Sequence, residues 1–167
     1  LKHEHKISFA DVVAMEVRIP PLRYQRHYAP EVKTGLRGKF AINYVVAMAF
    51  LDGKLEIATF SDEKVNQPQV QDALSKVKVI VDESIPEPGP YCPVSVELKN
   101  GTRHSYTAKI AKGDPRNPMS EAEVMEKFRS NAGLVLSDKK AAALTVLGRN
   151  LEAVSNIGQL TDLLTPP

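Results

Sequence analysis

An alternating run of apolar residues near the start of the chain constrains the fold more than any other feature of the sequence. The apolar members of this run are Val13, Met15, Val17 and Ile19. A period of two over seven residues predicts a half-buried β-strand. Pro20 and Pro21 then end the strand, because proline has no N–H for the hydrogen-bond ladder. The chain is therefore expected to contain a sheet with one face against a core.

The hydrophobic period becomes helical further along the chain. Four apolar residues recur at spacings of four, four and three, namely Phe40, Tyr44, Met48 and Leu51. This spacing places them on one face of a helix over about residues 37–52, which Gly53 is expected to end. The helix is the most hydrophobic in the chain and is expected to be central. Residues 22–34 show no clean period and are expected to form a loop.

Two short helices and a second strand are expected next. Ser61 suits the start of the first helix, and Pro68 suits the first turn of the second, which runs to about Lys76. Alternating valines over residues 77–81 predict the strand, and a proline-rich loop follows over residues 85–93.

Asn100-Gly101 predicts a β-hairpin between two further strands. A two-residue turn would mix apolar and polar residues on one face of the hairpin. A three-residue loop, Lys99 to Gly101 with Gly101 left-handed, avoids this mixture, because a slip of one residue turns every side chain to the other face. The predicted pairs are then Leu98 with Thr102, Val96 with His104, and Val94 with Tyr106.

The last third of the chain is predicted to be helical. Ser120 and Glu123 form a capping box for a helix that runs to about Asn131, with Val124 inward. Ser137 begins a further helix with apolar residues through Val154, and residues 157–164 are expected to form one or two final turns.

Four strands and five or six helices that do not strictly alternate favour an α+β fold. We predict a two-layer sandwich: a roughly four-stranded, partly antiparallel sheet with helices on one face, followed by C-terminal helices. The 167 residues suffice to bury a core. No run of about 18 apolar residues is present, so no membrane span is expected. The single Cys92 excludes an internal disulfide and suits the cytoplasm. Because the chain begins at Leu1, we expect it to be a piece of a longer protein.

Positive charge is concentrated in the first quarter of the chain. Residues 1–40 contain eight Lys/Arg and four Asp/Glu, although the net charge of the whole chain is only +2. That small net charge, together with the lack of a recognition helix, argues against nucleic-acid binding. Two interpretations of the basic segment remain open: a solvated face, or a site for a small anion.

Several residues are candidates for chemistry. His3 and His5 lack further metal ligands near them, His104 is expected on the inward face of a strand, and Cys92 has no identifiable partner. Lys39 is more informative, because the predicted helix places it in the first turn, where the helix dipole favours anions. An exposed lysine on a core helix is the alternative interpretation.

Residues 33–44, Lys-Thr-Gly-Leu-Arg-Gly-Lys-Phe-Ala-Ile-Asn-Tyr, resemble the core motif of the MmgE/PrpD family. Other segments resemble the family in the same order, and the resemblance runs from about residue 8 to residue 150. These segments are the strand Val12–Pro20, Phe60-Ser61-Asp62-Glu63, residues 112–120 and Lys127-Phe128.

The resemblance implies a function. The family comprises 2-methylcitrate dehydratases, cis-aconitate decarboxylases and related epimerases of small polycarboxylates. Its members resemble one another in having a helical domain and a smaller α+β lid with the active site between them. The resemblance also implies a homodimer with neither a metal nor another cofactor. Residues 1–135 would be the lid-type domain and residues 136–167 a C-terminal helical segment, with the helical domain upstream. An exposed apolar patch is then expected on the last helices, where the helical domain would dock.

The resemblance also assigns site residues. It places Lys39 and Tyr44 at motif positions that face the family's active site, so both are predicted to be catalytic. Lys39 is also predicted to bind substrate, and Arg37 is added on charge. The family often has Ser where this chain has Ala41, which puts one substrate contact in doubt. A non-catalytic α+β binding module and an epimerase remain the alternatives to a polycarboxylate lyase.

Overall fold

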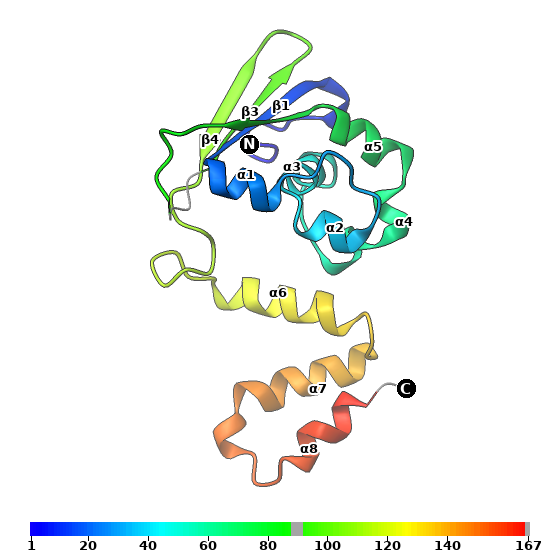
Figure 1. Cartoon of the computed structure of the whole chain (residues 1–167). Helices are drawn as coiled ribbons and strands as arrows, with labels where there is room; N and C mark the ends of the chain where they lie inside the picture. Colours follow the sequence, from blue (N-terminus) through cyan, green and yellow to red (C-terminus); the bar gives the residue numbers. More distant parts are fainter. Residues whose placement is uncertain (88–91, 166–167) are drawn as a thin grey trace. The chain divides into compact units, whose positions relative to one another are not determined.

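A computed structural model describes residues 1–87 and 92–165. The chain divides into two compact units, which we call unit 1 (Leu1–Ala111) and unit 2 (Lys112–Pro167) (Figure 1). The predicted α+β class is confirmed, since unit 1 contains a mixed four-stranded sheet with helices and unit 2 is helical. The expected domain boundary at residues 135–136 stays a prediction; the compact units divide earlier, after Ala111.

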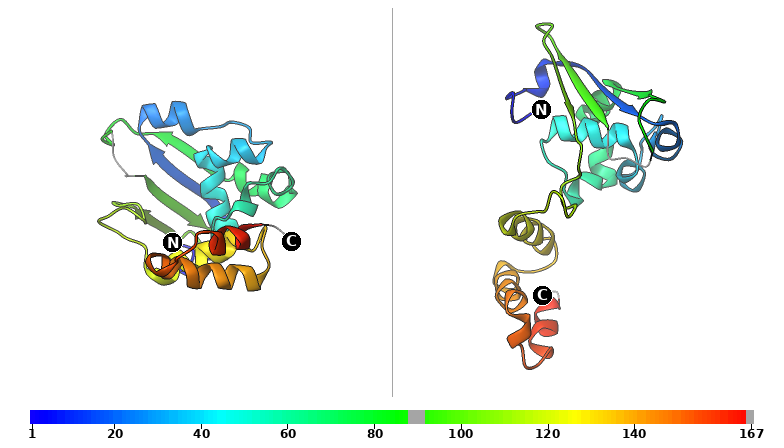
Figure 2. Two further views of the ribbon diagram at one scale, coloured as in Figure 1. Left: turned by 90° about the horizontal axis from the view of Figure 1, so that it is seen from below. Right: turned by 90° about the vertical axis from the view of Figure 1, so that its left-hand side faces the viewer.

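The sheet has the strand order β2-β1-β3-β4. Its strands are β1 (Val12–Ile19), β2 (Val77–Val81), β3 (Pro93–Leu98) and β4 (Arg103–Thr107). β1 runs parallel to β2 and antiparallel to β3, and β3 runs antiparallel to β4. Parallel neighbours need a long crossover connection. The helices between β1 and β2 provide that connection, and α3 and α5 among them lie on one side of the sheet (Figure 2).

The predicted hairpin register is confirmed. Val96 pairs with His104 and Val94 pairs with Tyr106. The amide of Leu98 donates to the carbonyl oxygen of Thr102 at 2.9 Å, which closes the three-residue loop. Gly101 has φ +79°, a left-handed conformation that glycine adopts without strain. The proline-rich loop expected over residues 85–93 lies partly outside the described residues.

β1 departs from simple alternation at its start. The register with β3 shifts between Val12 and Ala14, which marks a β-bulge. Val12 is therefore buried, whereas Val13 is turned outward and is 48% exposed. The expected inward position of Val13 was wrong, because the bulge moves the alternation by one residue before Met15.

Short helices fill the connection from β1 to β2. They are α1 (Pro21–His27), α2 (Gly35–Lys39), α3 (Ile42–Leu51), η2 (Ile57–Phe60), α4 (Asp62–Val65) and α5 (Pro68–Ser75). The 3-10 turn η1 (Phe9–Asp11) precedes β1. The helices expected from Ser61 and Pro68 are confirmed as α4 and α5. The expectation of a loop over residues 22–34 was wrong at its start, where Pro21 occupies the first turn of α1.

The single helix predicted over residues 37–52 is divided into α2 and α3. Ala41 adopts an extended conformation (φ −103°, ψ 112°) between them. Phe40 consequently leaves the predicted apolar face and is 53% exposed, whereas Tyr44 and Met48 are fully buried. Lys39 is the last residue of α2, so its expected place in the first turn of a long helix was also wrong.

The core of unit 1 consists of two clusters on opposite sides of α3. The sheet cluster contains Ile7, Val12, Met15, Val17, Ile19, Val46, Phe50 and Val96. The α3 cluster contains Ala29, Val32, Ala41, Tyr44, Met48, Val65 and Val70. A helix that is apolar on every side is one that is buried on every side. α3 is therefore the central helix, as its hydrophobicity predicted.

Unit 2 contains α6 (Glu121–Ala132), α7 (Asp138–Arg149), η3 (Leu151–Ala153), α8 (Gly158–Thr161) and η4 (Asp162–Leu164). The predicted capping box of α6 is confirmed: Ser120 and Glu123 exchange hydrogen bonds between side chain and backbone. Val124 is 49% exposed, so its expected inward position was wrong. Apolar residues that are exposed in this region include Val146, Leu151, Ile157 and Leu164, and the expected apolar patch on the last helices stays a prediction. Among the described residues, no helix combines the length and apolar character needed to cross a membrane.

Candidate active-site segment and neighbouring cavities

Two glycines hold α2 against the segment that follows α3. The amide of Gly35 donates to Asp62 Oδ1 at 2.7 Å, and a Cβ at Gly35 would lie 1.8 Å from the carbonyl oxygen of Phe60. A Cβ at Gly38 would lie 2.9 Å from the ring of Tyr44. Both contacts require glycine because they leave no space for a side chain. The Gly-x-x-Gly spacing of the motif therefore positions Lys39 and Arg37 on a docked, short helix.

The two cations of α2 are exposed, but they differ in their partners. Arg37 donates from Nη2 to the carbonyl oxygen of Tyr28 at 3.0 Å, which leaves its other N–H groups available. The Lys39 ammonium donates no hydrogen bond to the described residues and forms no ion pair with them. Since Lys39 ends α2, its charge already suits the carbonyl end of a helix and does not require an anion there.

Tyr44 lies in the core rather than at a surface. Its hydroxyl donates to the carbonyl oxygen of Thr59 at 2.5 Å, and its ring packs 6.0 Å from that of Phe60. Burial, together with the smaller effect of the nearby charge of Asp52, raises the pKa of Tyr44 to about 12. The phenol is therefore protonated at neutral pH and acts as a donor that ties α3 to η2.

The three predicted site residues lie outside the two cavities described next, since neither cavity is lined by Lys39, Arg37 or Tyr44. Lys39 and Arg37 lie on the surface of α2, and Tyr44 lies beneath it against Gly38. Their catalytic roles stay predictions.

The larger cavity, which we call the Asn43 cavity, has a volume of about 330 Å³. Its wall combines the segment before α2, the start of α3 and the end of α5, and includes Tyr28, Val32, Asn43, Gln71, Leu74 and Ser75. Lys33 and Glu31 lie at its wall and pair at 2.8 Å, which holds the pKa of Glu31 below its usual range. The sequence alone assigns Asn43 no role, because only the fold shows that it lines a cavity.

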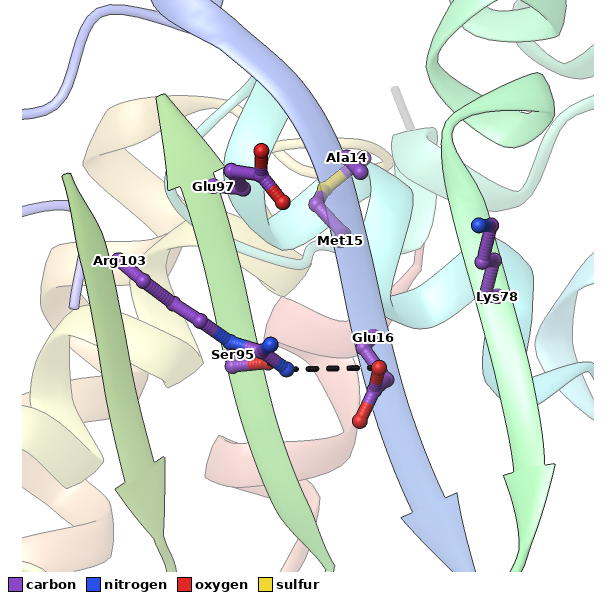
Figure 3. A pocket seen from close by; sticks show the side chains of 7 residues that line it. All are labelled: Ala14, Met15, Glu16, Lys78, Ser95, Glu97 and Arg103. Carbon is purple, nitrogen blue, oxygen red and sulfur yellow. Dashed lines mark hydrogen bonds and ion pairs between the residues drawn. The ribbon is translucent and has the colours of Figure 1, made fainter. Parts of the chain in front are cut away.

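The smaller cavity lies on the sheet and has a volume of about 70 Å³ (Figure 3). Arg103 extends from β4 across β3 toward Glu16 on β1. Its Nη2 lies 2.8 Å from Ser95 Oγ and 3.4 Å from Glu16 Oε2, while Arg18 Nε lies 2.9 Å from Glu16 Oε1. The carboxylate of Glu16 is thus already paired with two guanidinium groups, and the space left would hold only a few water molecules.

The remaining candidates have structural partners. His3 Nε2 lies 3.0 Å from the carbonyl oxygen of Gly53, and His5 stacks on His104 with ring centroids 3.9 Å apart. Arg23 Nη1 donates to Cys92 Sγ at 2.9 Å. Within residues 1–87 and 92–165, no three His, Cys, Asp or Glu side chains gather in a way suited to a metal ion.

The fold and the glycine-containing helix pair α2–α3 define an α+β domain with a basic surface helix docked on a buried tyrosine. Comparison with known proteins identifies the family to which this domain belongs. The profile of the MmgE/PrpD C-terminal domain matches residues 1–153, and this chain belongs to that family.

Individual relatives agree with this assignment. The chain is 32% identical over 156 residues to cis-aconitate decarboxylase of Mus musculus and 33% identical over 156 residues to that of Homo sapiens. Each alignment covers 90% of this chain and 31% of the relative. Cis-aconitate decarboxylase of Aspergillus terreus (strain NIH 2624 / FGSC A1156) is 24% identical over 139 residues, 80% of this chain and 28% of the relative. The chain therefore spans about a third of these relatives, which their names describe as decarboxylases, a kind of lyase.

Proposed function

We propose that this chain is the lid-type domain of a metal-independent lyase that acts on a small polycarboxylate, such as cis-aconitate or 2-methylcitrate. The observation that carries the proposal is the alignment of 90% of the chain with cis-aconitate decarboxylases. Because the alignment covers 31% of each relative, a helical domain of the same parent chain would complete the active site and supply its other catalytic groups.

Loss of water or carbon dioxide from a polycarboxylate requires that its negative charges be neutralised and that a proton move to or from carbon. We assign the first task to Lys39, with Arg37 as a second cation. Two observations support this assignment: the Lys39 ammonium has no partner among the described residues, and Arg37 uses one nitrogen on Tyr28. In a closed cleft each such contact contributes about 2–4 kcal/mol to transition-state stabilisation.

Tyr44 is assigned the orientation or relay of a proton, and its environment restricts how it acts. A phenol with a pKa of about 12 is a proton donor near neutral pH and not a base. Its hydroxyl donates to the carbonyl oxygen of Thr59, so a catalytic role requires that η2 move away and a substrate atom take its place. Tyr44 would then be freed only when the domain closes on substrate.

Turnover of di- and tricarboxylates by the longest protein that contains this chain tests the proposal. We expect Lys39→Ala to lower kcat/KM by about 30- to 1000-fold, the loss that corresponds to about 2–4 kcal/mol. Tyr44→Phe is expected to lower kcat with less effect on KM. Lys139→Ala removes an equally exposed lysine of α7 and is the matched control. Wild-type turnover in both Lys39→Ala and Tyr44→Phe would remove these residues from the site.

The burial of Tyr44 favours a second candidate, a non-catalytic α+β binding module. Such a module would bind polycarboxylates without converting them, whereas an epimerase of the same family would change only their stereochemistry. Following each substrate by proton NMR separates the lyase, the epimerase and the binding module. Dehydration, decarboxylation and epimerisation give different products, and a binding module gives none. Assembly as a homodimer and a cytoplasmic location are further parts of this proposal.

A further inference from the structure

The wall of the Asn43 cavity contains a buried acceptor that no residue satisfies. Asn43 is only 6% exposed. Its Nδ2 donates to the carbonyl oxygen of Ala29 at 2.8 Å, which fixes the orientation of the amide. Its Oδ1 is buried and has no hydrogen-bond partner among the described residues. Buried side-chain acceptors are almost always paired, because leaving one unpaired sacrifices the hydrogen bond it made to water.

The other polar groups of this wall also present acceptors. Gln71 donates from Nε2 to the carbonyl oxygens of Val32 and Val65, at 3.2 and 2.8 Å, so its Oε1 is the group left over. Ser75 donates its hydroxyl proton to the carbonyl oxygen of Asp72 at 2.7 Å, so its lone pairs remain. Gln71 and Ser75 therefore add free acceptors to that of Asn43, while the Tyr28 hydroxyl at the same wall can donate or accept. These acceptors favour a ligand that donates hydrogen bonds.

The charge and shape of the cavity further restrict the class of ligand that it can bind. Lys33 is paired with Glu31, and both side chains are about three-quarters exposed, so neither offers an unpaired buried charge to a ligand. Removing a charged ligand from water without a buried counter-ion is costly, which favours a neutral ligand. Leu74, Val77 and Val32 give the wall an apolar portion. The volume of about 330 Å³ is at the lower end of the range for small-molecule sites.

We propose that the Asn43 cavity binds a small neutral molecule that has an amide N–H or hydroxyl donor and a short apolar part. The donor bonds to Asn43 Oδ1, and the apolar part lies against Leu74 and Val77. This site goes beyond the proposed lyase function, because it binds a neutral molecule and uses neither Lys39 nor Tyr44. The two proposals can therefore be tested independently, and failure of one does not contradict the other.

A pair of matched probes tests the site by NMR titration of the ¹⁵N-labelled 167-residue chain. Propionamide has two N–H donors, and N,N-dimethylpropionamide has the same carbonyl without a donor. We expect propionamide to cause saturable shifts of the Val32, Asn43, Leu74 and Val77 amides, with at least tenfold weaker binding of the dimethyl compound. Equal binding of the two probes, or no saturable shift at these amides, would overturn the proposal.

Three variants sharpen the test. Asn43→Leu keeps the volume but removes the acceptor, so propionamide binding should fall about tenfold, or about 1.4 kcal/mol. Leu74→Phe fills the cavity from α5 without touching Asn43 and should abolish binding; it decides the question if Asn43→Leu does not fold. Lys39→Ala should leave binding unchanged. Undiminished binding in Leu74→Phe would place the ligand elsewhere and refute the site.

Discussion

The two compact units of the chain are stabilised in different ways. Unit 1 buries two apolar clusters in which Met15, Tyr44 and Met48 are fully inaccessible. In the described part of unit 2, the buried hydrophobic residues are Ala132, Ala141 and Leu144. Its helices depend more on exposed polar contacts, such as the capping box of α6 and the ion pair between Arg149 of α7 and Glu121 of α6. Burial of large side chains contributes far more free energy than exposed ion pairs, so the stabilities of the two units should respond to different substitutions.

The tyrosines of the chain make it possible to measure the unfolding of unit 1 separately. All five tyrosines, at positions 24, 28, 44, 91 and 106, lie in unit 1, and the chain has no tryptophan. Tyrosine fluorescence therefore reports on unit 1, whereas far-UV circular dichroism reports on the helices of both units. If the denaturation curves from the two methods do not coincide, the two units unfold separately.

The largest effect is expected from a cavity in unit 1. Met48→Ala removes a fully buried side chain from the α3 cluster and should lower the free energy of unfolding by about 2–5 kcal/mol. Val146→Ala in α7 removes a side chain that is 63% exposed and should change it by less than about 0.5 kcal/mol. Urea denaturation followed by tyrosine fluorescence and circular dichroism measures both. Similar losses in the two variants would contradict the difference between the units.

Replacing glycine by alanine at two different positions should change the stability of the protein in opposite directions. Gly35→Ala forces a Cβ to within 1.8 Å of the Phe60 carbonyl oxygen and should destabilise unit 1 by about 1–3 kcal/mol. Gly148 lies inside α7, and a Cβ added to it would have no atom within 4 Å apart from its chain neighbours and the nearby backbone of its own helix. Gly148→Ala should therefore stabilise that helix by about 0.5–1 kcal/mol. Thermal unfolding followed by circular dichroism compares them. Stabilisation by Gly35→Ala would mean that α2 is not docked as described.

The buried phenol predicts a loss of stability at high pH. Folding raises the pKa of Tyr44 from near 10 to about 12. Its contribution to stability is therefore complete below pH 10 and is lost as the pH rises through 12. The free energy of unfolding of the wild type should fall across this range more steeply than that of Tyr44→Phe, in urea titrations at each pH. Parallel curves for the two proteins would show that the hydroxyl is not buried.

The smallest effect is expected at low pH in unit 2. Hydrogen bonds from the Ser120 amide, Lys112 and the Ser120 hydroxyl lower the pKa of Glu123 from 4.5 to about 2. The stability that this carboxylate contributes is complete above pH 4.5 and is lost as the pH falls toward 2. The Ser120 amide proton, which donates to Glu123 Oε2 at 2.7 Å, should report this titration by NMR. Glu123→Gln should abolish the shift, and a midpoint near 4.5 in the wild type would show that the capping box is open.

Local patterns were sufficient to predict the strands and several caps of this fold. The hairpin register followed from which residues Val94 and Val96 would face, and the capping box followed from Ser120 and Glu123. Each of these features depends on residues a few positions apart. The outward turn of Val13 did not follow, because a β-bulge adds a residue without changing the apolar pattern on either side of it.

The candidate site was harder to predict because its geometry depends on distant contacts. The spacing of Phe40, Tyr44 and Met48 fits one continuous helix, yet the chain is extended at Ala41. The contact of Gly35 with Phe60 joins residues on either side of α3 in the chain and has no local signature. The unpaired oxygen of Asn43 is equally invisible in the sequence, since it depends on where Ala29 lies.

The central place of β1 has a consequence for how the protein is made. β1 leaves the ribosome before the other strands of its sheet, yet Met15 pairs with Val77 and Val12 pairs with Leu98, more than sixty residues later. Nascent chains emerge from their N-terminus at about 5–20 residues per second, so β1 waits several seconds without a neighbour. Its unpaired edges and apolar side chains are open to other chains during that time, and this interval is when the nascent polypeptide most needs a chaperone.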